Sequence, residues 1–178
     1  YETDNFRTNG SLKSQTIYYY GANESDAVAG GGFWFWQKPL DVAMKYSTTY
    51  YYGVDYKTEP THKYKQSVTY YSGARGSEKT TFQVAFDSLG EAKTTTFFKY
   101  GRASNPDLID KTYAVRGDRH LDYENTGVDK TFVSMSQYQN NYSGEEKIQY
   151  TYNFRGGMTG TLPPALSNQT VRNTISYT

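Results

Sequence analysis

Side-chain character alternates with a period of two residues along most of this chain. The pattern is clearest in four segments, residues 12–20, 42–52, 81–87 and 148–154. Successive side chains of a β-strand point to opposite faces of a sheet, so this alternation is typical of strands. β-Branched and aromatic residues dominate the same segments, and they favour strands over helices. We therefore predict a chain built mainly of β-strands.

Glycines and polar residues separate the predicted strands. We expect four glycines to end strands, namely Gly21, Gly53, Gly73 and Gly101. The segment Ser88–Glu91 predicts a turn between two strands. One short helical turn is expected over Asn105–Ile109, because a proline follows a residue type that caps helices.

The spacing of strands and turns predicts the fold class. Roughly eight to ten strands joined by short turns indicate an all-β fold, an antiparallel β-sandwich or barrel rich in tyrosine and threonine. The length of 178 residues fits one domain, and no change of composition marks a boundary. We expect a single β domain over residues 1–178.

Composition narrows the classes of protein to which the chain could belong. It contains 20 tyrosines, 9 phenylalanines and 2 tryptophans, and its 19 lysines and arginines nearly balance 18 acidic residues. Abundant aromatic rings and a small net charge argue against disorder and for a core that contains aromatic rings. The lack of a basic excess argues against a nucleic-acid partner. No run of 18 apolar residues is present, so no transmembrane helix is expected.

Location and redox chemistry are indicated only indirectly. The absence of cysteine excludes disulfides and thiolate metal sites. The chain opens at Tyr1 without a methionine, which fits a processed mature chain or a trimmed one. Together with the richness in tyrosine and threonine, this suggests a secreted or cell-surface protein.

The most unusual local sequence is a run of three glycines followed by Phe33–Trp36. In a strand, Trp34 and Trp36 would share one face and the two phenylalanines the other. A central strand covered on both faces explains this pattern structurally. A functional interpretation is an aromatic platform for a sugar ring, a lipid headgroup or a neighbouring subunit.

Runs of consecutive tyrosines raise the same question. They place rings on both faces of their strands, and one face can fill the core while the other meets solvent or a partner. We take Tyr19, Tyr51 and Tyr71 as candidate ligand or interface residues, because tyrosine is enriched at protein interfaces. Partial exposure to solvent is the alternative.

Neither a metal site nor a catalytic site is predicted. Asp122, Glu124 and Asp129 form a loose match to an oxygen-rich calcium loop, but a polar surface strand or turn explains them equally. Only two histidines are present, without cysteine and without a nucleophile, zinc or phosphate-loop motif. We therefore assign no catalytic residues, expect no cofactor, and predict that the protein is not an enzyme.

The segment 169–177 alternates after a stiff Leu-Pro-Pro sequence and predicts a final strand. Val171, Ile175 and Tyr177 would lie on one face of it. Such a strand can pair within its own sheet or complete the sheet of a neighbouring copy.

Three functional hypotheses follow. The first is an extracellular structural or adhesive protein that self-assembles by β-strand addition, with copies of itself as partners. The second is a lectin-like module that binds a cell-surface glycan on exposed tryptophans and tyrosines. The third is a membrane-active, pore-forming toxin that uses the alternating stretch of residues 66–100.

Overall fold

The computed structural model describes residues 2–21, 28–29, 42–53, 63–102, 105–119, 121, 130–139, 147–160 and 171–176. Over these residues the chain is all-β, and neighbouring strands run antiparallel, which confirms the predicted fold class. The backbone divides into two compact units, Tyr1–Ala92 and Lys93–Thr178. A single domain over residues 1–178 stays a prediction.

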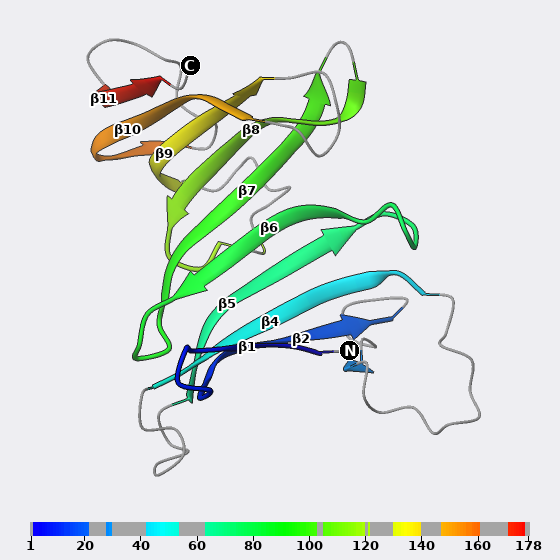
Figure 1. Cartoon of the computed structure of the whole chain (residues 1–178). Coiled ribbons are helices and arrows are strands. Elements are labelled where there is room, and N and C mark those ends of the chain that lie inside the picture. Colours follow the sequence, from blue (N-terminus) through cyan, green and yellow to red (C-terminus); the bar gives the residue numbers. More distant parts are fainter. Residues whose placement is uncertain are drawn as a thin grey trace. The chain divides into compact units, whose positions relative to one another are not determined.

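The sheet of the first unit is a meander of strands (Figure 1). Its described strands are β1 (Glu2–Phe6), β2 (Leu12–Tyr20), β3 (Val28–Ala29), β4 (Met44–Tyr52), β5 (Lys63–Ser72) and β6 (Lys79–Phe86). They lie in the order β1-β2-β4-β5-β6, and β3 pairs with β2. Strands that follow one another in sequence therefore lie side by side, as is usual for antiparallel sheets with short connections.

The register of this sheet places one row of side chains in its core. Ile17 is opposite Thr48, Thr48 is opposite Val68, and Val68 is opposite Val84. The last three side chains are buried, and Val84 is only 2% exposed. Because the side-chain period of a strand is two, this pairing also fixes which residues share a face in each of the four strands.

The second unit repeats the meander. Its strands are β7 (Ala92–Arg102), β8 (Asn105–Arg116), β9 (Lys130–Gln139), β10 (Lys147–Gly160) and β11 (Val171–Ser176). They pair in this order, each antiparallel to the next. In each unit the described strands make an open meander, so the finer expectation of a sandwich or barrel stays a prediction.

Buried side chains of the second unit gather on one face of β7, β8 and β9. Thr95 is opposite Val115, and Val115 is opposite Phe132. All three are almost completely buried, as are Phe97 and Met135 two to three positions away. The core therefore mixes phenylalanine with aliphatic residues, and among the described tyrosines only Tyr52 is comparably buried.

A buried polar residue in this core has its hydrogen bonds satisfied. The Thr95 hydroxyl donates to the backbone carbonyl of Gly117 at 2.7 Å and accepts from the backbone N–H of Arg119 at 2.9 Å. Burying a hydroxyl is unfavourable unless it is hydrogen-bonded. Thr95 thus fixes the chain that follows β8 against β7.

Two turn predictions are confirmed. Gly21, Gly53 and Gly73 each directly follow the last residue of a strand. At Ser88–Glu91, the Asp87 N–H donates to the Glu91 carbonyl at 2.9 Å and Gly90 closes the turn with a φ of 83°. A positive φ suits glycine because it has no Cβ.

Two local predictions are wrong. The segment Asn105–Ile109 begins strand β8 instead of forming a helical turn, because Leu108 is completely buried and Ile109 pairs with Tyr100. Gly101 does not end its strand, since β7 continues to Arg102. The register shifts between Tyr100 and Arg102, and Gly101 has a φ of 111°, so this glycine permits a bulge within the strand.

Candidate functional site

Four aromatic rings form a continuous stack across the sheet of the first unit. Tyr19, Tyr46, Tyr70 and Phe82 lie directly opposite one another on β2, β4, β5 and β6. The successive ring centroids are 4.3, 5.8 and 4.4 Å apart, with interplanar angles of 13°, 33° and 25°. We call these four residues the aromatic ladder. Cross-strand aromatic pairs of this kind stabilise a sheet beyond the area that they bury.

The ladder follows from the alternation and the register together. Each ring lies two residues along its strand from a member of the row Ile17, Thr48, Val68 and Val84, and therefore on the same face. The ladder residues themselves are only half-buried. Tyr19 was a predicted site residue, whereas the other three ladder residues were not, because the sequence does not reveal which strand positions are opposite.

Electrostatics keep the Tyr19 phenol neutral. Burial raises the pKa of Tyr19 above its ordinary value, and the nearby phenols of Tyr50 and Tyr46 raise it further. A neutral phenol remains a hydrogen-bond donor as well as an acceptor. This end of the ladder therefore carries no charge near neutral pH.

Stacking limits what the ladder can bind. The two inner rings, those of Tyr46 and Tyr70, each have an aromatic neighbour on both sides. A sugar ring packs on the face of an aromatic ring, and these faces are already in use. The stack is therefore better suited to stiffening the sheet than to forming a row of sugar-binding platforms.

Cationic side chains rest on rings of the same face, farther along the strands. The Lys63 ammonium lies 4.1 Å from the centroid of the Tyr50 ring and 5.4 Å from that of Tyr52. The Lys65 ammonium lies 4.1 Å from the Phe86 centroid. Contacts at these distances are cation–π interactions, and they direct both lysine stems along the sheet.

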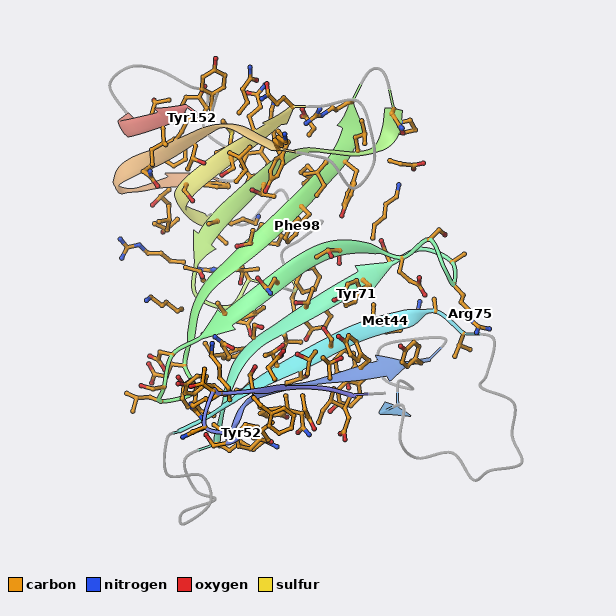
Figure 2. The ribbon with its side chains drawn as sticks, in the orientation of Figure 1. Met44, Tyr52, Tyr71, Arg75, Phe98 and Tyr152 are labelled. Atoms are coloured by element: carbon orange, nitrogen blue, oxygen red, sulfur yellow. The ribbon has the colours of Figure 1, made fainter. Side chains whose placement is uncertain are left out.

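The opposite face carries the two other candidate tyrosines. The Tyr51 ring lies 5.3 Å from that of Tyr64, and the Arg7 guanidinium lies 5.5 Å from the Tyr51 centroid. The Tyr71 hydroxyl is 3.2 Å from the Ser47 hydroxyl. Figure 2 shows Tyr71 on β5, well separated from Tyr52 at the far end of β4. Tyr19, Tyr51 and Tyr71 therefore do not form one site.

Arg7 fastens the turn between β1 and β2 to the end of β4. Its guanidinium donates to the backbone carbonyl of Leu12 at 2.6 Å, to that of Tyr52, and to the Tyr51 hydroxyl at 3.3 Å. The planar guanidinium can satisfy several acceptors at once, which an ammonium cannot do with the same geometry. Sequence reasoning missed this role, because a lone arginine near a turn gives no signal.

β1 and β11, the first and last strands in the strand order, each pair with only one described strand. β1 pairs with β2, and β11 pairs with β10, with Thr151 opposite Ile175 and Asn153 opposite Asn173. All five residues of β1 are exposed, and so are Thr174 and Ile175 of β11. The predicted final strand thus exists and pairs within its own chain, with Val171 as its first residue.

Several candidate residues lie outside the described residues. They are Trp34, Trp36, Tyr177, Asp122, Glu124 and Asp129. Among the residues that are described, no three histidine, aspartate or glutamate side chains gather as metal ligands would. The described residues also contain no helix that is long and apolar enough to cross a membrane.

Similarity to known proteins gives no further assignment. No protein-family model matches this chain, and no curated protein or solved structure is significantly similar to it.

Proposed function

We propose that this chain is a non-enzymatic, extracellular structural or adhesive protein that self-associates by adding β-strands at its sheet edges. The observation that carries the proposal is the outer edge of β11, where no described residue pairs with the strand. An edge strand presents backbone N–H and C=O groups that a further strand can pair.

The composition of β11 supports this role. Its sequence, VRNTIS, has one charged residue, no proline and three β-branched residues. Ile175 is 42% exposed. Proteins that avoid edge pairing commonly place several charges or a proline on such a strand. β11 has no such protection beyond its single arginine.

The remaining surface is compatible with a structural role. Several half-buried tyrosines of the first unit, such as Tyr19, Tyr46 and Tyr50, stack on one another or lie against a cation, and stacked rings stiffen a sheet. The near balance of acidic and basic residues lowers the repulsion between copies. Secretion or display at the cell surface is part of the proposal and agrees with the cysteine-free, tyrosine-rich composition.

The test is the solution mass of the purified chain, measured by size-exclusion chromatography with light scattering. We expect species larger than a monomer that grow with concentration. Ile175→Lys places a charge on the β11 edge at an exposed position and should shift the distribution toward monomer. Leu89→Lys is the matched control, since Leu89 is 85% exposed in a turn between strands. A monomeric wild-type chain at all concentrations contradicts the proposal.

A carbohydrate-binding module is the alternative proposal. It depends on Trp34 and Trp36, because the rings of Tyr46 and Tyr70 have aromatic neighbours on both sides and the Lys63 ammonium lies over the Tyr50 ring. A glycan array, with Trp34→Ala and Trp36→Ala as paired controls, separates this proposal from self-association. Glycan binding that both substitutions abolish, by a monomeric chain, would favour it.

A further inference from the structure

The outer strands of the two units have opposite charge. β1 (ETDNF) contains Glu2 and Asp4 and no cationic residue. β11 (VRNTIS) contains Arg172 and no acidic residue. β10, the partner of β11, contains Lys147 and Arg155 and again no acidic residue.

The charge of β1 is not neutralised by the nearest arginine. The Arg7 guanidinium is directed to the carbonyls of Leu12 and Tyr52 and to the Tyr51 ring. Glu2 accepts a hydrogen bond from the neutral Gln15 amide at 3.4 Å. The β1 edge therefore presents two exposed carboxylates to an incoming strand.

Like-with-like pairing is disfavoured at the β1 edge and gives the charge of β11 no partner. Two antiparallel β1 strands overlapped over their full length would place Asp4 opposite Asp4, whereas two β11 strands would place Arg172 opposite Ile175. Like charges opposite one another destabilise a strand pair, whereas opposite charges stabilise it. The partner that fits β1 is an uncharged or cationic strand, and β11 is such a strand.

We propose that β1 of one copy receives β11 of the next, so that the chain assembles head to tail. This inference rests on the proposed self-association and adds its polarity and register. A heterologous contact between two different surfaces continues from copy to copy unless a rotation closes it into a ring. The product is therefore a filament or a closed ring, and not a dimer formed by pairing two β1 strands or two β11 strands.

Length and charge select one antiparallel register. With Arg172 beside Asp4, Thr3 is opposite Asn173 and Glu2 is opposite Thr174. The pairing of β11 with β10 shifts by one residue at Arg172, so the regular ladder is counted only from Asn173 onward. If Glu2 were opposite Arg172 instead, β1 would end before it reached Asn173, and the two strands would overlap over fewer residues. The register with Asp4 opposite Arg172 keeps both the longer ladder and the charge pair.

The absence of native cysteine allows a direct test by disulfide trapping. Directly opposed residues of antiparallel strands have Cα atoms about 4.5–5.5 Å apart, within the range that a disulfide bridges. A Thr3→Cys chain mixed with an Asn173→Cys chain should form a mixed disulfide dimer under mild oxidation. Thr3→Cys mixed with Leu89→Cys is the control and should give no more than background cross-linking.

A charge exchange tests the same contact without cysteine. Asp4→Arg alone should raise the concentration needed for assembly by roughly threefold to tenfold, because an attractive pair becomes repulsive. Adding Arg172→Asp to the same chain should restore assembly. Glu91→Lys with Asp107→Lys adds positive charge at exposed positions away from both edges and should leave assembly unchanged.

The two proposals fail in different ways. If the wild-type chain assembles but the Thr3 and Asn173 variants give no mixed disulfide above the control, the head-to-tail contact is overturned while self-association stands. Failure of Arg172→Asp to restore assembly of Asp4→Arg also overturns it. If the wild-type chain is monomeric throughout, both proposals fall.

Discussion

The rings of Tyr19 and Tyr46 stack with their centroids 4.3 Å apart and their planes 13° from parallel. The two residues are directly opposite on β2 and β4, which are separated in sequence by more than twenty residues. Tyr46 also contacts the Tyr70 ring on its other side. Tyr46 is therefore, like Tyr70, a position at which a single substitution interrupts the aromatic ladder.

Replacing Tyr46 by leucine should lower the free energy of unfolding by about 1–3 kcal/mol, because two ring contacts are lost at a half-buried site. Urea unfolding measures the change, and Tyr46→Phe, which keeps the stack, should stay close to wild type. A double-mutant cycle with Tyr19→Leu should give a coupling of about 0.5–1.5 kcal/mol. Strict additivity of the two substitutions would mean that the stack adds nothing beyond burial.

Replacing Thr95 by valine should lower the free energy of unfolding by about 1–3 kcal/mol, because the Arg119 N–H loses its acceptor and the Gly117 carbonyl loses its donor. Valine has nearly the same shape, so the loss reports the hydrogen bonds. Thr95→Ser keeps the hydroxyl and serves as the control. Denaturant unfolding measures the stability of both variants. A Thr95→Val protein that is more stable than the Thr95→Ser protein would contradict this assignment.

Glu78 connects the start of β4 to the turn between β5 and β6, and it should make the stability of the first unit depend on pH. The Glu78 carboxylate accepts from the Met44 N–H at 3.1 Å and from the Gly76 N–H at 2.7 Å. Figure 2 labels Met44 at the start of β4 and Arg75 in the turn after β5, the two segments that Glu78 connects. Desolvation opposes ionisation, but these backbone hydrogen bonds, its own N–H and Arg75 outweigh it and lower the pKa of Glu78.

The pKa of Glu78 is lower in the folded chain than in the unfolded chain. As the pH falls, Glu78 therefore takes up a proton in the unfolded chain before it does so in the folded chain. The stabilisation is complete above the unfolded value of about 4.3 and is lost as the pH falls through the folded value. Wild type should therefore be more stable than Glu78→Gln at pH 7, and the difference should shrink below about pH 4. Thermal unfolding of both proteins across this range measures it, and a pH-independent difference would exclude the carboxylate as its cause.

Arg7 should control how firmly β1 is attached. Arg7→Lys keeps the charge but loses the fork that reaches the Leu12 and Tyr52 carbonyls, so the amides of β1 and of the first half of β2 should exchange faster with deuterium. Amides of β5 and β6 should be unaffected and act as an internal control. If β1 is the receiving edge, this variant should also assemble less readily, and unchanged exchange in β1 would show that the turn is held by other contacts.

Much of the fold could be predicted from local sequence. The alternation of residues 12–20 and 81–87 corresponds to β2 and β6, and three of the four predicted strand-ending glycines occupy that position. These predictions succeeded because the period of a strand and the conformational freedom of glycine act within a few residues. The prediction at Asn105–Ile109 was wrong because burial of Leu108 in the sheet outweighed the local preference for a helical turn.

The candidate site could be predicted only in part. Tyr19 was recognised from its tyrosine run, but the run alone does not tell which of three adjacent rings is opposite Tyr46. Register shifts add to the difficulty: between Thr49 and Tyr50 the pairing slips, so that Tyr50 lies opposite Lys65. A slip of one residue moves a side chain to the other face of the sheet.

The sequence by itself determined that this chain forms β-strands and that their faces are rich in tyrosine and threonine. Only the tertiary structure decided that Tyr19, Tyr46, Tyr70 and Phe82 form one stack while Tyr51 and Tyr71 lie on the opposite face. The physical reason is that strand formation depends on residues that are close in the sequence. The pairing between strands depends instead on which side chains become buried and where bulges shift the register, and both are set only when the sheet assembles.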